Sequence, residues 1–278
     1  MTISGNIVET RMARASGHFG EWLQGRIGPK GPIALISVQC PVFWAQVSYA
    51  SGDAFQYTDP LPALSSDRAI ALLSALSLPV QGSISGRTNI EAGAGLGAST
   101  SSLLALAKAL IKRDIHPEDL AKILVAIEEA SDPLMFPDFD RLLWASREAR
   151  VVNHFPAPPQ FEVIGGCWGA PSETDPRDQN FPDIADLVEA WGPAVTASDR
   201  EKTAAIATES FRRTTAIRNR SAEPTEDLAR DLGALGVIRA HTGSARGFLF
   251  EPGRAPSTGL HQLQEAGYST PVTFLTGG

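Results

Sequence analysis

The sequence predicts a globular protein that combines strands and helices, with enough chain for one large domain or two modest ones. Three observations support this. Of the 278 residues, 43% are hydrophobic, so the chain can bury a proper core. Stretches with strand character dominate its beginning. Stretches with helical periodicity recur through the middle and the second half.

The first part of the chain predicts a β-meander. Turn residues separate apolar stretches here, and the expected strands cover Glu21–Ile27, Ile33–Val38 and Phe43–Tyr49. A segment rich in Pro, Ser and Asp follows at Gly52–Ser66 and is expected to be a loop. It leads into a helix over Ser66–Leu76 and then a strand over Ile84–Ile90.

The most informative stretch is Ile90–Leu106. Gly93, Gly95 and Gly97 let the backbone adopt positive φ and approach a ligand closely. Four hydroxyl residues come next, and apolar residues then recur at helical spacing, so a helix is expected to begin inside the hydroxyl run with one of its members as N-cap. A helix that opens from a glycine loop presents unpaired N–H groups and the positive end of its dipole, which favours phosphate.

Two familiar phosphate-binding motifs do not fit this stretch. A Walker loop needs a Gly-Lys pair, and the chain has none. A Rossmann loop follows a buried apolar strand, whereas Gly82–Glu91 alternates polar and apolar residues. A plain connecting loop stays open as the alternative, because Gly and Ser are common in turns.

The core of this stretch, Gly-Leu-Gly-Ala-Ser-Thr at Gly95–Thr100, resembles the second motif of the GHMP kinases, the superfamily of galactokinase, homoserine kinase and mevalonate kinase. Its usual form is Pro-x-x-x-Gly-Leu-Gly-Ser-Ser-Ala; here Ala98 replaces the first serine, and Glu91 and Ala92 occupy the region of the proline. The resemblance implies that Ser99 contacts magnesium. The implied ATP-binding residues are Gly93, Gly95, Leu96, Gly97, Ala98, Ser99 and Thr100.

Two carboxylates flank the end of the next expected helix, Glu118–Ala130. Glu129 and Asp132 are three residues apart, and Pro133 biases Asp132 out of the helix. An ordinary acidic helix end is the alternative. The Glu-x-x-Asp spacing resembles the Glu-Pro-Thr-Asp of the L-threonine kinases, a narrower GHMP branch. That match implies Asp132 as the catalytic base and Glu129, or else Glu128, as a magnesium ligand.

Two further stretches resemble the same branch. Gly-Glu-Trp-Leu-Gln-Gly at Gly20–Gly25, followed by Cys-Pro-Val, is similar to its first motif, and Ala-His-Thr-Gly at Ala240–Gly243 is similar to its Ala-His-Ser-Gly. The implied substrate contacts are Glu21, Gln24, His241, Thr242 and Gly243. From the residues alone, a solvated carboxylate at Glu21 and a structural role for His241 are the alternatives.

The second half begins after an expected linker at Val151–Pro159, where prolines interrupt any periodic element. A strand is expected from Phe161, another before the turn at Thr242–Gly247, and a strand or helix after that turn. The expected helices cover Asp183–Trp191, Arg200–Ile217 and Glu226–Leu235.

The resemblance implies a two-domain α+β protein with the GHMP kinase fold. A ribosomal protein S5 domain 2-like domain would occupy residues 1–152 and a ferredoxin-like domain residues 160–278, with ATP, Mg²⁺ and a small-molecule substrate bound between them. Ser99 and Asp132 would be the catalytic residues. The implied activity is an L-threonine kinase of cobalamin synthesis. A kinase for homoserine or another small hydroxylated metabolite, and a catalytically silent nucleotide- or metabolite-binding protein, are the alternatives.

Composition limits the partners. A net charge of -7 and a pI near 5.3 argue against a nucleic-acid surface. Cys40 and Cys167 are too few for a disulfide framework or a zinc site, although one bridge stays open. The first residues lack the apolar core of a signal peptide, and no apolar run reaches membrane-spanning length. A soluble cytoplasmic protein is therefore expected, with its oligomeric state open.

Overall fold

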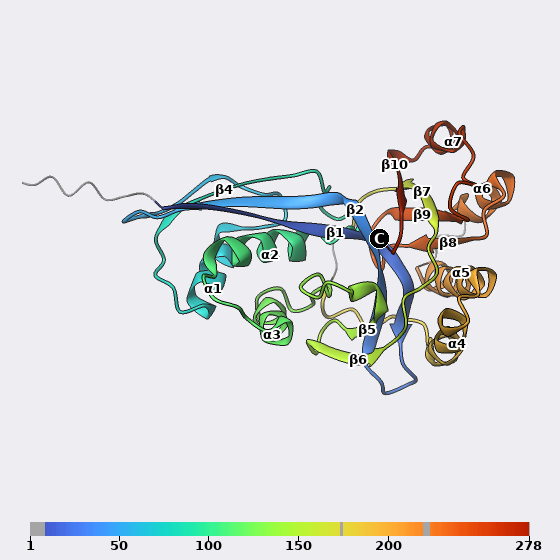
Figure 1. The fold of residues 1–278 in the computed structure, drawn as a ribbon, viewed down its shortest axis with the longest axis horizontal. Helices are drawn as coiled ribbons and strands as arrows, with labels where there is room; N and C mark the ends of the chain where they lie inside the picture. The colour runs from blue at the N-terminus through green and yellow to red at the C-terminus, as the bar shows by residue number, and fades with distance from the viewer. Residues whose placement is uncertain (1–8, 173–174, 219–222, 278) are drawn as a thin grey trace, which may run out of the picture.

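The computed structural model describes residues 9–172, 175–218 and 223–277, and it confirms the α+β fold (Figure 1). Its main sheet follows the strand order β10-β7-β9-β8-β1-β2-β4-β3, and a further pair, β5 and β6, joins it through β2. The expectation about a signal peptide concerns in part residues 1–8, which lie outside the described residues. No helix in the described part is long and apolar enough to cross a membrane.

Two long antiparallel strands run through the molecule, β1 (Thr10–Arg26) and β2 (Ile33–Ala50). The expected division of β2 into two strands is wrong. Pro41 lies exposed where the β1–β2 register shifts, between the pairs Ser16↔Trp44 and His18↔Gln39. A bulge tolerates a proline because no ladder hydrogen bond is needed there, so the strand continues past it.

The N-terminal half adds further strands and helices to this ribbon, and the helices cover one face of it (Figure 1). These elements are β3 (Phe55–Asp59), α1 (Ser66–Ala75), β4 (Gly82–Thr88), α2 (Ala98–Leu110), α3 (Pro117–Glu128), η1 (Phe139–Arg141), β5 (Leu142–Ala145) and β6 (Arg150–His154). The expected loop at Gly52–Ser66 contains β3, a short edge strand parallel to β4. The first part of the expected linker is β6, which pairs with β5.

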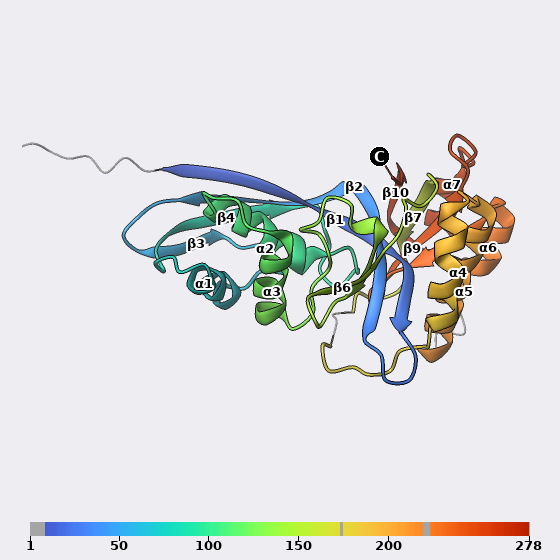
Figure 2. The same cartoon turned by 60° about the horizontal axis from the view of Figure 1, so that its bottom comes forward.

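The C-terminal half contains β7 (Glu162–Cys167), α4 (Ala185–Thr196), α5 (Arg200–Ile217), α6 (Thr225–Leu232), β8 (Gly236–Arg239), β9 (Ala245–Phe250), α7 (Gly259–Glu265) and β10 (Ser269–Leu275). Helices α4 and α5 lie side by side against β1 and β8 (Figure 2). The expected α4, α5 and α6 are confirmed, as are the strands that flank the turn after Arg239. A division of the chain between residues 152 and 160 stays a prediction.

Strand β1 joins the two halves, because it pairs with β2 along its length and with β8 at Glu21↔Arg239. The aromatic core at this junction draws on both halves. The ring of Trp22 lies 5.4 Å from Phe161 and 6.0 Å from Trp191, centroid to centroid. The polar side chains at the same junction form the site described next.

Candidate active site

A cavity of about 480 Å³ lies where β1, α2 and the loop after β8 meet. It brings together most of the residues that the sequence singled out. Its lining includes His18, Glu21, Arg68, Gly93, Gly95, Leu96, Gly97, Ala98, Ser99, Thr100, Glu128, Asp132, Arg147, His241 and Thr242. Gln24, Glu129 and Gly243 are the predicted site residues that do not line it.

The glycine loop forms one wall. Gly95 has φ +77°, and a Cβ there would lie 2.3 Å from the Cβ of Ala240, so only glycine allows the two loops to approach this closely. Gly243 packs on the other side of the same contact, where a Cβ would lie 2.3 Å from the backbone of Ala94. The role of Gly243 is therefore loop packing.

Helix α2 begins at Ala98, and its N-cap is Gly97, in the left-handed conformation and without a side-chain cap hydrogen bond. The expectation of a hydroxyl N-cap is wrong. Ser101 and Ser102 instead donate back to the carbonyl of Ala98, while Ser99 turns toward α3. The N–H groups of the first turn are left without a side-chain acceptor, which preserves the helix terminus as an anion site.

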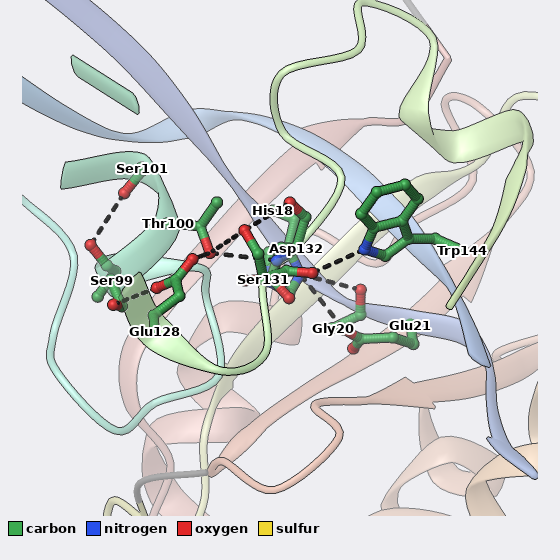
Figure 3. A network of polar contacts seen from close by, with 11 residues as sticks. His18, Gly20, Glu21, Ser99, Thr100, Ser101, Glu128, Ser131, Asp132 and Trp144 are labelled. Carbon is green, nitrogen blue, oxygen red and sulfur yellow. Dashed lines mark hydrogen bonds and ion pairs between the residues drawn. The ribbon is translucent and has the colours of Figure 1, made fainter. Parts of the chain in front are cut away.

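The hydroxyls of Ser99 and Thr100 converge on one carboxylate (Figure 3). Ser99 Oγ donates to Glu128 Oε2 at 2.5 Å, and Thr100 Oγ1 donates to Glu128 Oε1 at 2.8 Å. Burial raises the pKa of Glu128 to about 7, although hydrogen bonds from Ser99, Ser131 and Thr100 oppose the shift. Arg68 Nη1 donates to Ser99 Oγ at 2.9 Å, which adds a cation at this end of the cavity.

Glu129, the expected metal ligand, is not brought to this group. Helix α3 ends at Glu128, and Glu129 is its C-cap with φ +65° and an exposed side chain. The left-handed residue turns the chain away from the helix direction, so adjacent carboxylates point to different places. Glu128, the alternative that the sequence resemblance left open, occupies the position beside Ser99.

Asp132 lies at the other side of Thr100 and forms an ion pair with the buried His18, while its own side chain is partly exposed to the cavity (Figure 3). His18 Nε2 is 3.3 Å from Asp132 Oδ2, and the Asp132 N–H donates to Thr100 Oγ1 at 3.1 Å. Burial lowers the pKa of His18, but Asp132 and Glu21 outweigh it and raise the pKa to about 9. Burial raises the pKa of Asp132, yet His18 outweighs it, and the result lies below the usual range.

His18 escaped the sequence analysis because its approach to Glu21 depends on bulges. The pairing of β1 with β2 shifts register between Ser16 and His18, again before Glu21, and once more before Leu23. Gly20, with φ +67°, lies between them. The bulges bring His18 Nδ1 within 3.7 Å of Glu21 Oε1, and one ligand atom each of His18, Glu21 and Asp132 lies within 4.8 Å of the others.

Glu21 is 2% exposed, and its Oε2 has no hydrogen-bond partner among the described residues. Burial raises the pKa of Glu21 to about 8, with His18 opposing the shift. The surface-carboxylate alternative is therefore wrong for this residue. A second cation close to Oε2 would lower this pKa further, as His18 already does.

The loop after β8 supplies the remaining wall. Gln24 lies behind the cavity, where its Nε2 donates to the Arg239 carbonyl at 3.2 Å and its Oε1 is 3.1 Å from His241 Nδ1. His241 lines the cavity and stacks on Phe181, with centroids 4.5 Å apart and an interplanar angle of 8°. Arg147 also lines the cavity, and its Cζ lies over the Phe181 ring, 5.5 Å from the ring centroid.

Comparisons with known proteins agree with this architecture. Residues 66–135 match the model of the GHMP kinases N-terminal domain. No curated protein sequence matches the chain at a significant level.

Three solved structures illustrate the likeness in fold. Homoserine kinase from Cytophaga hutchinsonii aligns with 100% of this chain and 97% of its own, at 13% identity and a TM-score of 0.66. Mevalonate kinase from Staphylococcus aureus aligns with 96% of this chain and 98% of its own, at 12% identity and a TM-score of 0.60. Mevalonate diphosphate decarboxylase from Legionella pneumophila aligns with 96% of this chain and 100% of its own, at 12% identity and a TM-score of 0.63. The sequence match is confined to residues 66–135, and the likeness to these structures over nearly the whole chain shows the same fold.

Proposed function

We propose that the protein is an ATP-dependent kinase that phosphorylates the hydroxyl of L-threonine to give L-threonine O-3-phosphate for cobalamin biosynthesis. One observation carries the kinase part. A single cavity holds an uncapped helix N-terminus with a hydroxyl–carboxylate pair at one end and a partly exposed aspartate, paired with a buried histidine, at the other. The threonine part rests on the three sequence stretches that resemble the threonine-kinase branch.

The end of the cavity at α2 suits a nucleotide triphosphate. Backbone N–H groups of Ala98, Ser99 and Thr100 would hold phosphate oxygens, and the Arg68 guanidinium adds a full positive charge near them. Phosphoryl transfer passes through a loose transition state, so alignment and neutralisation of charge supply most of the catalysis.

Magnesium fits between Ser99 and Glu128. Both offer hard oxygen atoms, which Mg²⁺ prefers, and no cation pairs with Glu128 among the described residues. Burial is the main cause of the raised pKa of this carboxyl, and a bound cation would lower it. The ion, when bound, would neutralise charge on the transferring phosphate. This assignment gives Glu128 the role that the sequence resemblance implied for Glu129.

Asp132 would orient the acceptor hydroxyl and accept its proton. Its lowered pKa keeps it ionised at neutral pH, and the imidazolium of His18 fixes the orientation of the carboxylate. An alcohol is much less acidic than a carboxylic acid, so the proton moves late in the reaction. The main contribution of Asp132 is therefore to position the nucleophile. We place the reaction in the cytoplasm, where thiols such as the free Cys40 and Cys167 stay reduced.

Homoserine or another small hydroxylated metabolite is the second candidate acceptor, because a homoserine kinase shares the fold over the whole chain. A catalytically silent protein that binds nucleotide or metabolite is the third candidate, and Ala98 in place of the usual serine favours it. The presence of Ser99, Glu128 and Asp132 in one connected network favours an enzyme.

The test is ADP release with Mg-ATP and L-threonine, run beside homoserine and serine. The highest kcat/KM with threonine, together with an inactive Asp132→Asn variant, would support the proposal. A preference for homoserine would reassign the acceptor and keep the kinase. ATP binding without ADP release from any acceptor would favour the silent protein.

A further inference from the structure

The tautomer of His241 is determined by its hydrogen-bond chain. Gln24 Nε2 donates to the carbonyl of Arg239, so the opposite atom, Oε1, faces His241 Nδ1. A reversed amide would place two acceptor oxygens against each other at 3.2 Å. Because Oε1 only accepts, Nδ1 must carry the hydrogen, and Nε2 is then an acceptor with a free lone pair.

The surroundings of His241 also oppose protonation of Nε2. Burial lowers the pKa of His241 to about 3, and the nearby guanidinium groups of Arg218, Arg147 and Arg239 act in the same direction, whereas Asp132 opposes them. The stack on Phe181 holds the ring plane, and Arg147 and Arg218 lie over Phe181 at 5.5 and 5.1 Å. The ring is therefore neutral and fixed in orientation.

Nε2 has no hydrogen-bond partner among the described residues, and His241 lines the cavity on the side of Asp132 and Glu21. Glu21 Oε2 is a buried acceptor atom that also has no partner there, whereas His241 itself is partly exposed to the cavity. Two acceptor atoms without a protein partner at one end of a cavity favour a ligand that brings hydrogen-bond donors. A carboxylate oxygen at this place would meet two lone pairs instead.

We propose that His241 Nε2 is the specificity-determining acceptor of the site, that it receives a hydrogen bond from a protonated amine of the phosphate-accepting substrate, and that Gln24 is its positioning residue. This inference rests on the proposed kinase function. It narrows the substrate class to amino alcohols, which include hydroxylated amino acids. Glu21 contributes to the same recognition, because its unpartnered Oε2 can accept a hydrogen bond from the ammonium group.

The first test reads the tautomer without any turnover. Nitrogen-15 spectra of the full chain, with the His241 signals assigned by their loss in His241→Gln, should show a protonated Nδ1 and an unprotonated Nε2 from pH 7.5 to pH 5. In Gln24→Met this tautomer should no longer dominate, whereas His261→Gln, on the exposed α7, should leave the spectrum of His241 unchanged. A protonated Nε2 in the wild type would overturn the proposal.

The second test compares L-threonine with 3-hydroxybutyrate, which keeps the hydroxyl and the carboxylate but lacks the amine. A site whose acceptors bind a hydrogen-bond donor of the substrate rejects an analogue that lacks this donor by roughly 10⁴-fold in kcat/KM. In His241→Phe, which keeps the stack on Phe181, that ratio should shrink by ~10-fold or more, mainly through KM for threonine. An unchanged ratio, or an equal loss of kcat with both acceptors, would contradict a contact with the amine.

Failure of the proposed function is distinguishable from failure of this inference. If no acceptor releases ADP, the kinase proposal fails, and L-threonine is instead titrated into the labelled protein. A shift of the His241 Nε2 signal with L-threonine, but not with 3-hydroxybutyrate, would still support amine recognition. An Nε2 signal that responds in the same way to both compounds, whether it shifts or not, would overturn the proposal of amine recognition.

Discussion

The two ends of the cavity are built in different ways. At the α2 end, the glycine loop and the hydroxyls that follow it are contiguous in sequence, and only Arg68 and Glu128 come from elsewhere. At the other end, His18, Asp132 and His241 come from three distant segments, and bulges in β1 bring His18 toward Glu21. The first end depends on local backbone conformation. The second depends on the tertiary fold and on desolvated charge.

Removal of the Asp132 charge should have the largest effect on activity. We expect Asp132→Asn to lower kcat by ~10²–10⁴-fold with little change in ATP affinity, because it removes the group that orients and deprotonates the acceptor. Steady-state kinetics of ADP release measure this. Asp138→Asn, in which the replaced side chain is exposed and pairs with His154, is the matched control. Equal losses in the two variants would contradict a special role for Asp132.

A pair of neighbouring carboxylates tests the α2 end. Glu128→Gln should raise the Mg²⁺ concentration needed for half-maximal activity by at least ~10-fold, because it removes a hard anionic oxygen beside Ser99. Glu129→Gln changes an exposed C-cap residue and should leave the magnesium curve unchanged. Activity measured against Mg²⁺ concentration separates the two variants. The opposite pattern would restore Glu129 as the ligand.

The contact between the two ends is tested at Gly95. A methyl group there would meet Ala240 at 2.3 Å, so Gly95→Ala should lower the free energy of unfolding by at least about 2 kcal/mol and weaken nucleotide binding. Gly233→Ala is the control, since Gly233 has φ +71° but no atom within 4 Å of an added Cβ. Denaturant unfolding compares them. If the two variants lose equal stability, positive φ alone explains the cost.

The smallest effect concerns pH. His18 has a pKa raised to about 9 from 6.5, so its contribution to stability is complete below pH 6.5 and is lost as pH rises through 9. Glu21, raised to about 8 from 4.5, also costs stability as pH rises, between 4.5 and 8. Both groups therefore predict a Tm that falls between pH 6.5 and 9.

Two histidine variants, His18→Gln and His154→Gln, test this prediction and control for it. Between pH 7 and pH 8, the slope of stability against pH corresponds to about two more protons bound by the folded than by the unfolded wild type, and to about one more in His18→Gln. His154→Gln alters an exposed ion pair and should keep the wild-type slope. Thermal unfolding at several pH values gives the slopes. A His18→Gln slope equal to that of the wild type would mean that His18 is neutral.

The sequence predicted the parts of the site whose geometry is local. The glycine loop, the helix after it and the turn at Ala240–Gly243 follow from short-range backbone preferences. The hydroxyl N-cap was wrong because Gly97 takes that position and the serines bond to the helix itself.

The other end of the site was less predictable for physical reasons. In a regular strand, residues three apart such as His18 and Glu21 point to opposite faces, and only the bulges in β1 overcome this. Whether Glu128 or Glu129 faces Ser99 depends on a single left-handed residue. The stack of Phe181 on His241 joins residues far apart in the chain, which no local pattern encodes.

The pairing of β1 with β8 has a consequence for synthesis of the protein. Glu21 meets Arg239 across the sheet, so β1 cannot complete its pairing until β8, which is far along the chain, has been synthesised. Closing so long a loop costs entropy before the contact repays it. A nascent chain can form the glycine loop and α2 before β8 exists, but the half of the cavity that contains Glu21, Gln24 and His241 is completed only after β8 and the loop that follows it. The substrate end of the cavity therefore forms later than the phosphate end.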